Sequence, residues 1–509
     1  MAQNISILGA TYSDVPAVEL PKSGGGTASF TDVTDTTAAA SDVASGKYFY
    51  TAAGVKTAGT ASGGGATLIT KSITQNGTYN ASSDNADGYS SVTVNVSGGG
   101  EVAPNDVNFY DYDGTILYSY SAADFANLSA LPANPTHTGL TAQGWNWSLS
   151  DAKTYVASYG MLDIGQMYIT DNGKTRIYIQ YPDFTADAAR TMQVRFKPSV
   201  ANGVMIDWGD GNTSTSNSTN LTDYTHVYGA NGEYVITLTA TSGTTYELQG
   251  ANTESIIGET TNAGSYKQIY LKRVEVGGNI TKIGANTFNN QLALESVTLP
   301  RGTNLSGDNI FAKTQSLRML IIPDGATGIG NYFVTEAYCL KRVSLPKTIT
   351  TIGTYFCQQL RNLERLAIPP NVTSIDGYVC SSCSRLQKVI IPSGIPKLNS
   401  NSFNGCQSLS LLIIPESVTE IGGSVFNSTF WTKIIIPKNV ASIGNNFARF
   451  SYGLRELYMY PTTPPTLGSN PFGSITSSLK IYVPNGKLSD YQSDSNWSNY
   501  ASYMVEMSA

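Results

Sequence analysis

The stretch Leu363-Glu-Arg-Leu-Ala-Ile-Pro369 decides the fold of this chain, because its pattern returns along the C-terminal half. Prolines recur every 23 residues from Pro300 to Pro415, and once more after 22 residues at Pro437. Leucines and Ile-Gly pairs keep the same period beside them. A period shared by three landmarks specifies a solenoid, in which each unit is one rung that packs against the next.

Each rung has the pattern Leu-x-x-apolar-x-apolar-Pro, followed by a turn, an Ile-Gly pair and an aromatic residue such as Phe356. The first part alternates with a period of two, which predicts a short parallel strand that ends at the proline. Leu363, Leu366 and Ile368 are expected to point inward in one rung. The Ile-Gly pair predicts a turn, and the aromatic segment predicts a helical or irregular return.

This repeat resembles the BspA-type leucine-rich repeats of bacterial and phage surface proteins, and the resemblance covers residues 254–461. Trp431 stands in the place of leucine in the shortened rung, which departs from the regular pattern. Residues 462–509, with Leu479-Lys-Ile-Tyr-Val-Pro484, look like the segment that closes such arrays. An open solenoid end requires a cap of this kind.

The predicted strands also define an outer face, because the third and fifth positions of each strand alternate with the buried fourth and sixth. A basic ladder beside an apolar column is expected there, as a binding surface for an anionic host polymer or a partner protein. The alternatives are a solvated sheet edge, or isoleucines covered by a neighbouring chain. The third positions are Arg342, Arg365, Lys388, Leu411 and Lys433, and the fifth positions include Ile390, Ile413 and Ile435.

Residues 171–253 resemble a PKD-type β-sandwich. The resemblance rests on Val204-Met-Ile-Asp-Trp-Gly-Asp-Gly211 and Gly232-Glu-Tyr-Val-Ile-Thr-Leu-Thr239. It implies a tight turn and an alternating strand, in a domain that serves as a spacer or a binding module. Asp207 and Asp210 are either calcium ligands or ordinary turn residues.

Residues 101–170 resemble the small β-grasp repeats of bacterial surface proteins. Within Val107-Asn-Phe-Tyr-Asp-Tyr-Asp-Gly-Thr-Ile-Leu117, the pair Asp113-Gly114 predicts a hairpin turn between two strands. Trp145 and Trp147 alternate on one strand face and are candidates for stacking on sugar rings if they are exposed. The alternative is core packing, because tryptophan is highly buried on average.

Residues 1–64 and 65–100 are predicted to be small β modules joined by glycine runs such as Gly63-Gly-Gly65. Segments 36–50, 76–80 and 87–96 look like modules at the front of tail-fibre-like proteins in phages of Gram-positive bacteria. Modules this small bury little surface alone, so assembly with other chains is expected. We predict a homotrimer that contacts other virion proteins through its N-terminus.

Composition and charge argue against several function classes. A net charge of −6 provides no basic field for nucleic acid. The sequence has neither a signal-peptide pattern nor a run of about 18 apolar residues, so no export signal and no membrane-spanning helix are expected. Its two histidines, His137 and His226, lie far apart, and no triad, metal cluster or phosphate loop is recognisable. We therefore expect no catalytic residue, metal site or cofactor.

The cysteines all lie between Cys339 and Cys406. Cys357 and Cys380 share one repeat position, and Cys383 and Cys406 share another, so these four are expected to stack in the solenoid interior as reduced thiols.

Taken together, the sequence predicts a mainly β, multidomain protein that does not act as an enzyme. The predicted function is that of a phage virion fibre or adhesin, which binds a host-surface glycan or protein through the solenoid. A structural virion decoration or neck fibre that makes protein contacts is the alternative. A wall-polysaccharide depolymerase is disfavoured, because no facing pair of carboxylates can be nominated.

Overall fold

A computed structural model describes residues 106–181, 191–251, 254–259, 271–473 and 478–508, together with the backbone of short strands before residue 100. The chain divides into two compact units, residues 1–103 and residues 104–509. The described strands of the first unit form antiparallel pairs. These pairs are β1 (Gln3–Ile7) with β2 (Ala10–Val15), β3 (Val18–Pro21) with β4 (Thr27–Phe30), β5 (Tyr48–Tyr50) with β6 (Lys56–Ala58), and β7 (Gly77–Tyr79) with β8 (Val92–Val94).

The second unit begins with a small α+β module, residues 106–170, which we name the cover module. Its sheet has the order β10-β9-β12-β11, with β9 and β12 parallel. Ser121 and Ser148 cap its two helices by accepting a hydrogen bond from a backbone N–H of the first turn. The predicted hairpin at Asp113-Gly114 is confirmed, and the β-grasp assignment stays a prediction. The elements are β9 (Val107–Tyr110), β10 (Ile116–Tyr120), α1 (Ala122–Ala126), β11 (Leu140–Trp145), α2 (Leu149–Tyr159) and β12 (Leu162–Thr170).

Two sheets follow and pack face to face around Phe196, Trp208 and Ile236. Their orders are β16-β15-β18-β13 and β17-β14-β19, with β20 also paired to β14. The PKD assignment of this sandwich stays a prediction. The strands are β13 (Thr175–Tyr181), β14 (Thr191–Pro198), β15 (Val204–Asp207), β16 (Thr213–Thr215), β17 (Thr222–Val227), β18 (Gly232–Ala240), β19 (Tyr246–Leu248) and β20 (Ile257–Glu259).

Both sheets of the sandwich continue into the solenoid. β21 (Leu271–Glu275) pairs with β13, and β23 (Ser296–Thr298) then pairs with β21 in parallel. On the other side, β22 (Ile280–Ile283) runs parallel to β19. The sandwich therefore closes the N-terminal end of the solenoid and shares its apolar core, rather than standing apart as a spacer.

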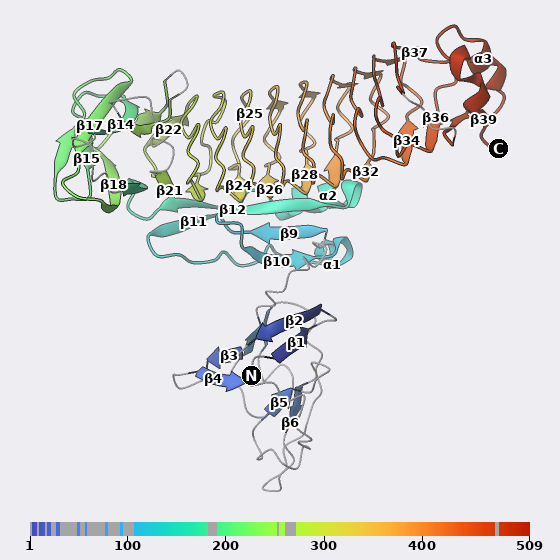
Figure 1. Ribbon diagram of the computed structural model, residues 1–509. Helices are drawn as coiled ribbons and strands as arrows, with labels where there is room; N and C mark the ends of the chain where they lie inside the picture. Colours follow the sequence, from blue (N-terminus) through green and yellow to red (C-terminus); the bar gives the residue numbers. More distant parts are fainter. Residues whose placement is uncertain are drawn as a thin grey trace. The chain divides into compact units, whose positions relative to one another are not determined.

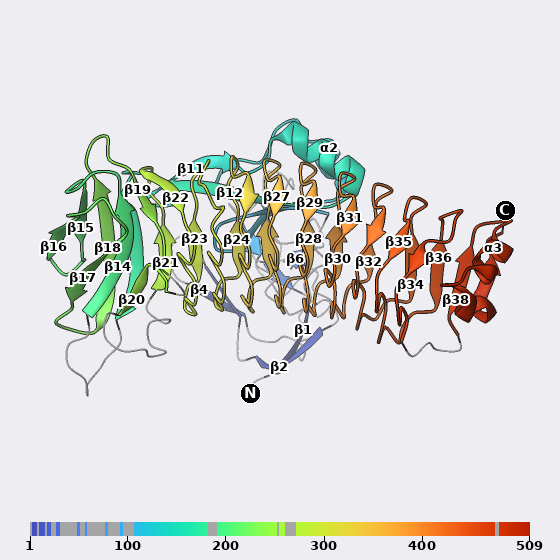
Figure 2. The ribbon, with the colours of Figure 1, turned by 90° about the horizontal axis from the view of Figure 1, so that it is seen from above.

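The solenoid has two rows of parallel strands, each made of successive hydrogen-bonded groups, which we call its first and second sheet (Figures 1 and 2). The first sheet carries the predicted strands after each leucine. It contains β24 (Met319–Ile321), β26 (Arg342–Ser344), β28 (Arg365–Ala367), β30 (Lys388–Ile390), β32 (Leu411–Leu412), β34 (Lys433–Ile436), β36 (Glu456–Met459), β38 (Lys480–Val483) and β39 (Met504–Glu506). The second sheet contains β25 (Gly328–Ile329), β27 (Thr351–Ile352), β29 (Ser374–Ile375), β31 (Lys397–Leu398), β33 (Glu420–Ile421), β35 (Ser442–Ile443) and β37 (Thr466–Leu467).

The second sheet corrects the sequence prediction, in which the Ile-Gly pair forms a turn. Ile352 instead ends a two-residue strand, and Gly353 follows it where the rungs come closest. A Cβ on Gly353 would lie 2.7 Å from the carbonyl carbon of Gly330 in the preceding rung. Glycine is therefore required by the close approach of two backbones. The aromatic return is irregular rather than helical.

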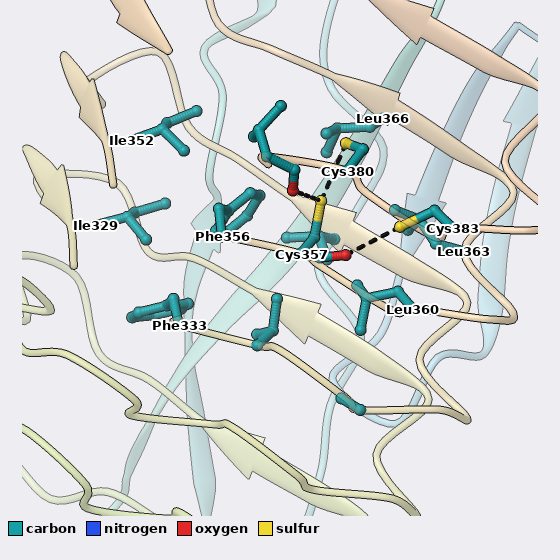
Figure 3. Close-up of a cluster of buried hydrophobic side chains, with 14 of the residues drawn as sticks. Ile329, Phe333, Ile352, Phe356, Cys357, Leu360, Leu363, Leu366, Cys380 and Cys383 are labelled. Atoms are coloured by element: carbon teal, nitrogen blue, oxygen red, sulfur yellow. Dashed lines mark hydrogen bonds between the residues drawn. The ribbon is translucent and has the colours of Figure 1, made fainter. Parts of the chain in front are cut away.

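The interior of the solenoid agrees with the repeat pattern. Leu363, Leu366 and Ile368 are completely buried, so the predicted register is confirmed. Cys357, Cys380, Cys383 and Cys406 are buried and free of disulfides, as predicted. Figure 3 shows three of these thiols among leucines and phenylalanines, with the Cys357 and Cys380 sulfurs 3.1 Å apart.

The C-terminal end is closed by α3 (Leu488–Ser493) and the 3₁₀ helix η4 (Ser498–Tyr503). Tyr491 and Trp497 are fully buried there, and their polar atoms donate to the carbonyls of Pro461 and Pro465 at 2.8 and 2.7 Å. These bonds satisfy the ring donors while the rings cover the last apolar rung. None of the described helices has the length and apolar content needed to span a bilayer.

Candidate functional site

The cover module lies along the first sheet of the solenoid, with β12 and α2 against the middle rungs (Figures 1 and 2). Its side chains bond to the ends of successive strands, where backbone carbonyls would otherwise lose their hydration. Three donors reach three rungs: Asn146 Nδ2 to the carbonyl of Ile322 (3.0 Å), Trp147 Nε1 to that of Leu345 (2.8 Å) and Tyr155 OH to that of Ile368 (2.7 Å).

A buried ionic cluster lies at the centre of this contact. Arg365 Nε donates to both carboxylate oxygens of Asp163, at 3.1 and 3.0 Å, and its Nη2 also bonds Asp163. Arg342 binds Glu364 of the neighbouring rung and donates to the Tyr110 hydroxyl at 3.2 Å. Arg342 and Arg365 are only 6% and 5% exposed. The prediction that they form an exposed basic ladder is therefore wrong, because the cover module buries them.

The pKa shifts in this cluster agree with the ion pairs that it contains. Burial, reinforced by the nearby Asp163 carboxylate, raises the pKa of Tyr110 to about 12, so the hydroxyl stays neutral. Burial acts to lower the pKa of Arg342, but the nearby Asp163 and Glu364 carboxylates raise it above the ordinary value. Both arginines therefore remain charged and act as fixed counter-ions in the interface.

The cover module also buries, fully or in part, the other two predicted surface positions beneath it, Ile390 and Lys388. Ile390 is buried with Ala367 in the apolar cluster of the cover module. The prediction of an exposed Ile390 is wrong, and its cover comes from the same chain rather than a neighbouring one. Lys388 is half-buried, and burial lowers its pKa while the nearby Asp106 opposes that effect.

Trp145 and Trp147 are buried, so the prediction that they stack on sugars from the surface is wrong. Trp145 packs edge-on against Phe109, with ring centroids 4.8 Å apart, and its Nε1 donates to the carbonyl of Pro132 at 2.9 Å. Trp147 joins the module to the solenoid through its bond to Leu345. Core packing, the alternative stated for both residues, accounts for them.

Beyond the cover module the same face is open. Ile413 is 70% exposed and Ile435 is 47% exposed, and Lys433 is exposed beside them. The side chain of Leu411 lies outside the described residues. In Figure 1, β34 and β36 lie past the end of the cover module. Of the eight predicted surface positions, the structure describes the side chains of seven, and three of these lie on an accessible surface.

The register of the following strands extends this surface toward the C-terminus, over positions that the sequence prediction did not name. Ile435 pairs with Tyr458, Tyr458 with Tyr482, and Tyr482 with Val505. Ile413 holds the equivalent position one rung earlier. The alternation in Glu456-Leu-Tyr-Met459 and Lys480-Ile-Tyr-Val483 was the available signal. We name the set Ile413, Ile435, Tyr458, Tyr482 and Val505 the uncovered column.

The two tyrosines of the uncovered column are tightly packed. Their rings stack with centroids 4.4 Å apart and planes inclined by 13°. The Lys433 ammonium lies 4.2 Å from the ring centroid of Tyr458, in cation–π contact. Glu456 and Lys480 continue the third-position row along the same strands. The site is thus an apolar strip with a charged margin.

Both histidines are engaged in pairs with aspartates. His137 Nε2 lies 2.7 Å from Asp111, which also accepts a bond from Tyr168. His226 lies 2.6 Å from Asp210 and stacks on Trp208. Asp210 also accepts from the backbone of Asn212, as in an ordinary turn. Within the described ranges, no cluster of three or more His, Cys, Asp or Glu side chains has a metal-binding arrangement.

Comparisons with known proteins bear on the repeat region. A leucine-rich repeat protein from Bacteroides ovatus has 17% identity, with 44% of this chain and 76% of that chain covered and a TM-score of 0.30. One from Eubacterium ventriosum has 23% identity, coverage of 41% and 59%, and a TM-score of 0.27. The pneumococcal vaccine antigen PcpA has 14% identity, coverage of 52% and 85%, and a TM-score of 0.27. No curated protein matches the chain.

One family model matches the repeat region. The model of the BspA-type leucine-rich repeat region matches six copies, over residues 259–387 and 373–495. The match falls on the rungs whose strands form the two parallel sheets and reaches into the predicted cap. Residues 259–495 are therefore leucine-rich repeats of the BspA type.

Proposed function

We propose that this protein is a non-enzymatic fibre or adhesin of a phage virion, which binds a host-surface receptor through the uncovered column. One observation carries the proposal: the apolar column of the first sheet continues past the module that covers it. Ile390 is buried under the module, whereas Ile413 in the next rung is 70% exposed. A contiguous apolar strip left open to water is typical of an interaction surface.

The cover module does not act as a lid over the middle rungs. β12 is joined to β13 of the sandwich by the short turn Asp171–Lys174. Its buried ion pair and three carbonyl-directed hydrogen bonds make release costly. The accessible part of the face is therefore its C-terminal part, from Ile413 onward.

The phage assignment is supported by the resemblance of residues 1–100 to the front modules of tail-fibre-like proteins. In this proposal the protein is made in the host cytoplasm, is incorporated into the virion, and forms a homotrimer held through residues 1–100. Light scattering of the full-length chain should give three times the monomer mass of 54.2 kDa. A monomer would contradict the proposed assembly.

Cell binding tests the function. Fluorescently labelled protein is incubated with a panel of Gram-positive strains and read by flow cytometry. Ile435→Asp should weaken binding by about tenfold or more, as expected for a central contact residue. Ser374→Asp, on an exposed position of the second sheet, is the matched control and should bind normally. Equal binding by both variants would overturn the assignment of the site.

The alternative functions give different outcomes. A structural virion decoration would leave cells unbound but still co-sediment with purified particles in an Ile435-dependent way. A depolymerase would release reducing ends from wall polysaccharide.

A further inference from the structure

We infer that the uncovered column binds a protein surface that combines apolar side chains with carboxylates, rather than a glycan. The inference rests on the proposed function and names the chemical class of its receptor. It rests on the contacts that the cover module makes with the same column in the middle of the solenoid.

The cover module shows what fits this face. Ala367 and Ile390, at the fifth strand position, are buried in one apolar cluster with side chains of the module such as Trp147. The module also supplies carboxylates. Asp163 pairs with Arg365 inside the contact, and Asp151 lies 2.5 Å from the Lys347 ammonium at its edge. The partner of the covered half is thus a folded protein surface that combines apolar side chains with carboxylates.

The uncovered half repeats part of this chemistry. Ile413 and Ile435 continue the fifth position, and after Leu411 the third position is again cationic at Lys433. Glu456 follows in the next rung, and Lys480 is exposed in the rung after that. A partner surface with apolar side chains against the isoleucines and a carboxylate against Lys433 would complement both the fifth and the third strand positions. The cover module complements the same two positions over the preceding rungs.

The geometry of the column disfavours a sugar. A pyranose packs its C–H face on an open aromatic face, but one side of Tyr458 is stacked on Tyr482 and Lys433 lies against its ring. Ile413, Ile435 and Val505 are aliphatic and offer no hydrogen bonds to hydroxyl groups. Trp145 and Trp147, the residues otherwise suited to sugar stacking, are buried.

The test uses cells that bind the full-length protein, pretreated with proteinase K or with periodate. Loss of binding after proteinase K, with binding retained after periodate, is the expected result. The reverse pattern, still sensitive to Ile435→Asp, would overturn the protein class and leave the proposed function standing. Cell binding that is insensitive to Ile435→Asp would instead overturn the proposed site itself.

A second probe decides the case in which no strain is bound. A displayed library of random 12-residue peptides is selected on the immobilised full-length protein. We expect peptides that combine apolar residues with Asp or Glu, weakened about tenfold by Lys433→Glu, since such a charge is worth about that factor at a desolvated contact. No enrichment over the Ile435→Asp variant would overturn the inference. Concentration-dependent self-association in sedimentation velocity, lost in Ile435→Asp, would do the same by assigning the column to a second copy.

Discussion

Asp163 and Arg365 form an ion pair between residues 202 positions apart, and both side chains are almost completely buried. The pair joins β12 of the cover module to β28 of the solenoid. It converts what would be a basic surface into an internal contact, because the carboxylate neutralises the guanidinium where water is excluded.

Removing the carboxylate should destabilise the fold strongly. Asp163→Ala leaves Arg365 buried without its counter-charge, which typically costs about 3–5 kcal/mol. Urea unfolding followed by tryptophan fluorescence measures this cost. The double variant Asp163→Leu/Arg365→Met should recover most of the lost stability, since an apolar pair of similar size avoids the charge penalty. Wild-type stability in the single variant would show that the pair is not buried in solution.

A buried and an exposed side chain of the first sheet should respond differently to truncation. Leu366→Ala removes a fully buried side chain and should cost about 2–5 kcal/mol. Ile413→Ala, on the same sheet but mostly exposed, should change stability by less than about 0.5 kcal/mol. Chemical denaturation of both variants gives the comparison. A loss under about 1 kcal/mol in Leu366→Ala would mean that the rung register is wrong.

The contact between α2 and the solenoid should weaken in acid. The pKa of Asp151 lies below its ordinary value, chiefly because Lys347 donates a hydrogen bond to it. A carboxylate with a depressed pKa stabilises the fold above its unfolded pKa of about 3.9, and this contribution is lost as the pH falls through the folded value.

Asp151→Asn should therefore lower the melting temperature at pH 7, and this deficit should shrink as the pH falls through the depressed pKa of Asp151 in the folded state. Thermal unfolding of both proteins across this pH range measures the difference. An equal deficit across the range would point to packing rather than charge.

The thiols should divide into two classes. Cys339 is exposed, whereas Cys357, Cys380, Cys383 and Cys406 are buried, and burial raises the pKa of Cys357 and Cys380. Titration with an aromatic disulfide reagent should label one thiol in the native protein and all five after unfolding. Cys339→Ser should abolish the native reaction. Rapid labelling of a second thiol would contradict a closed interior.

The interior of the solenoid was predictable because its information is local. Leu363, Leu366 and Ile368 recur at fixed spacings, so strand alternation alone assigns them inward. The two-residue strands of the second sheet were not predictable in this way. A strand as short as Thr351–Ile352 shows no alternation, and its Ile-Gly pair also suits a turn.

The position of the cover module over the solenoid could not be predicted from the repeat, because the contacts between them join segments far apart in the chain. Periodicity assigns Arg342 and Arg365 to the outside of a rung but does not state what lies there. One signal was present in the cover module. Gly165 stands inside β12, and a Cβ there would lie 2.4 Å from Cγ2 of Ile321. A glycine within a strand is typical of a close approach by another element.

Asp106, at the start of the cover module, lies close to Lys388 of β30. Tyr458 lies three rungs beyond Lys388, which at about 4.8 Å per rung is a distance of about 15 Å along the solenoid. A force applied to a receptor on the uncovered column would reach the cover contact through these rungs, and the buried Asp163–Arg365 pair is one of the interactions that hold this contact together.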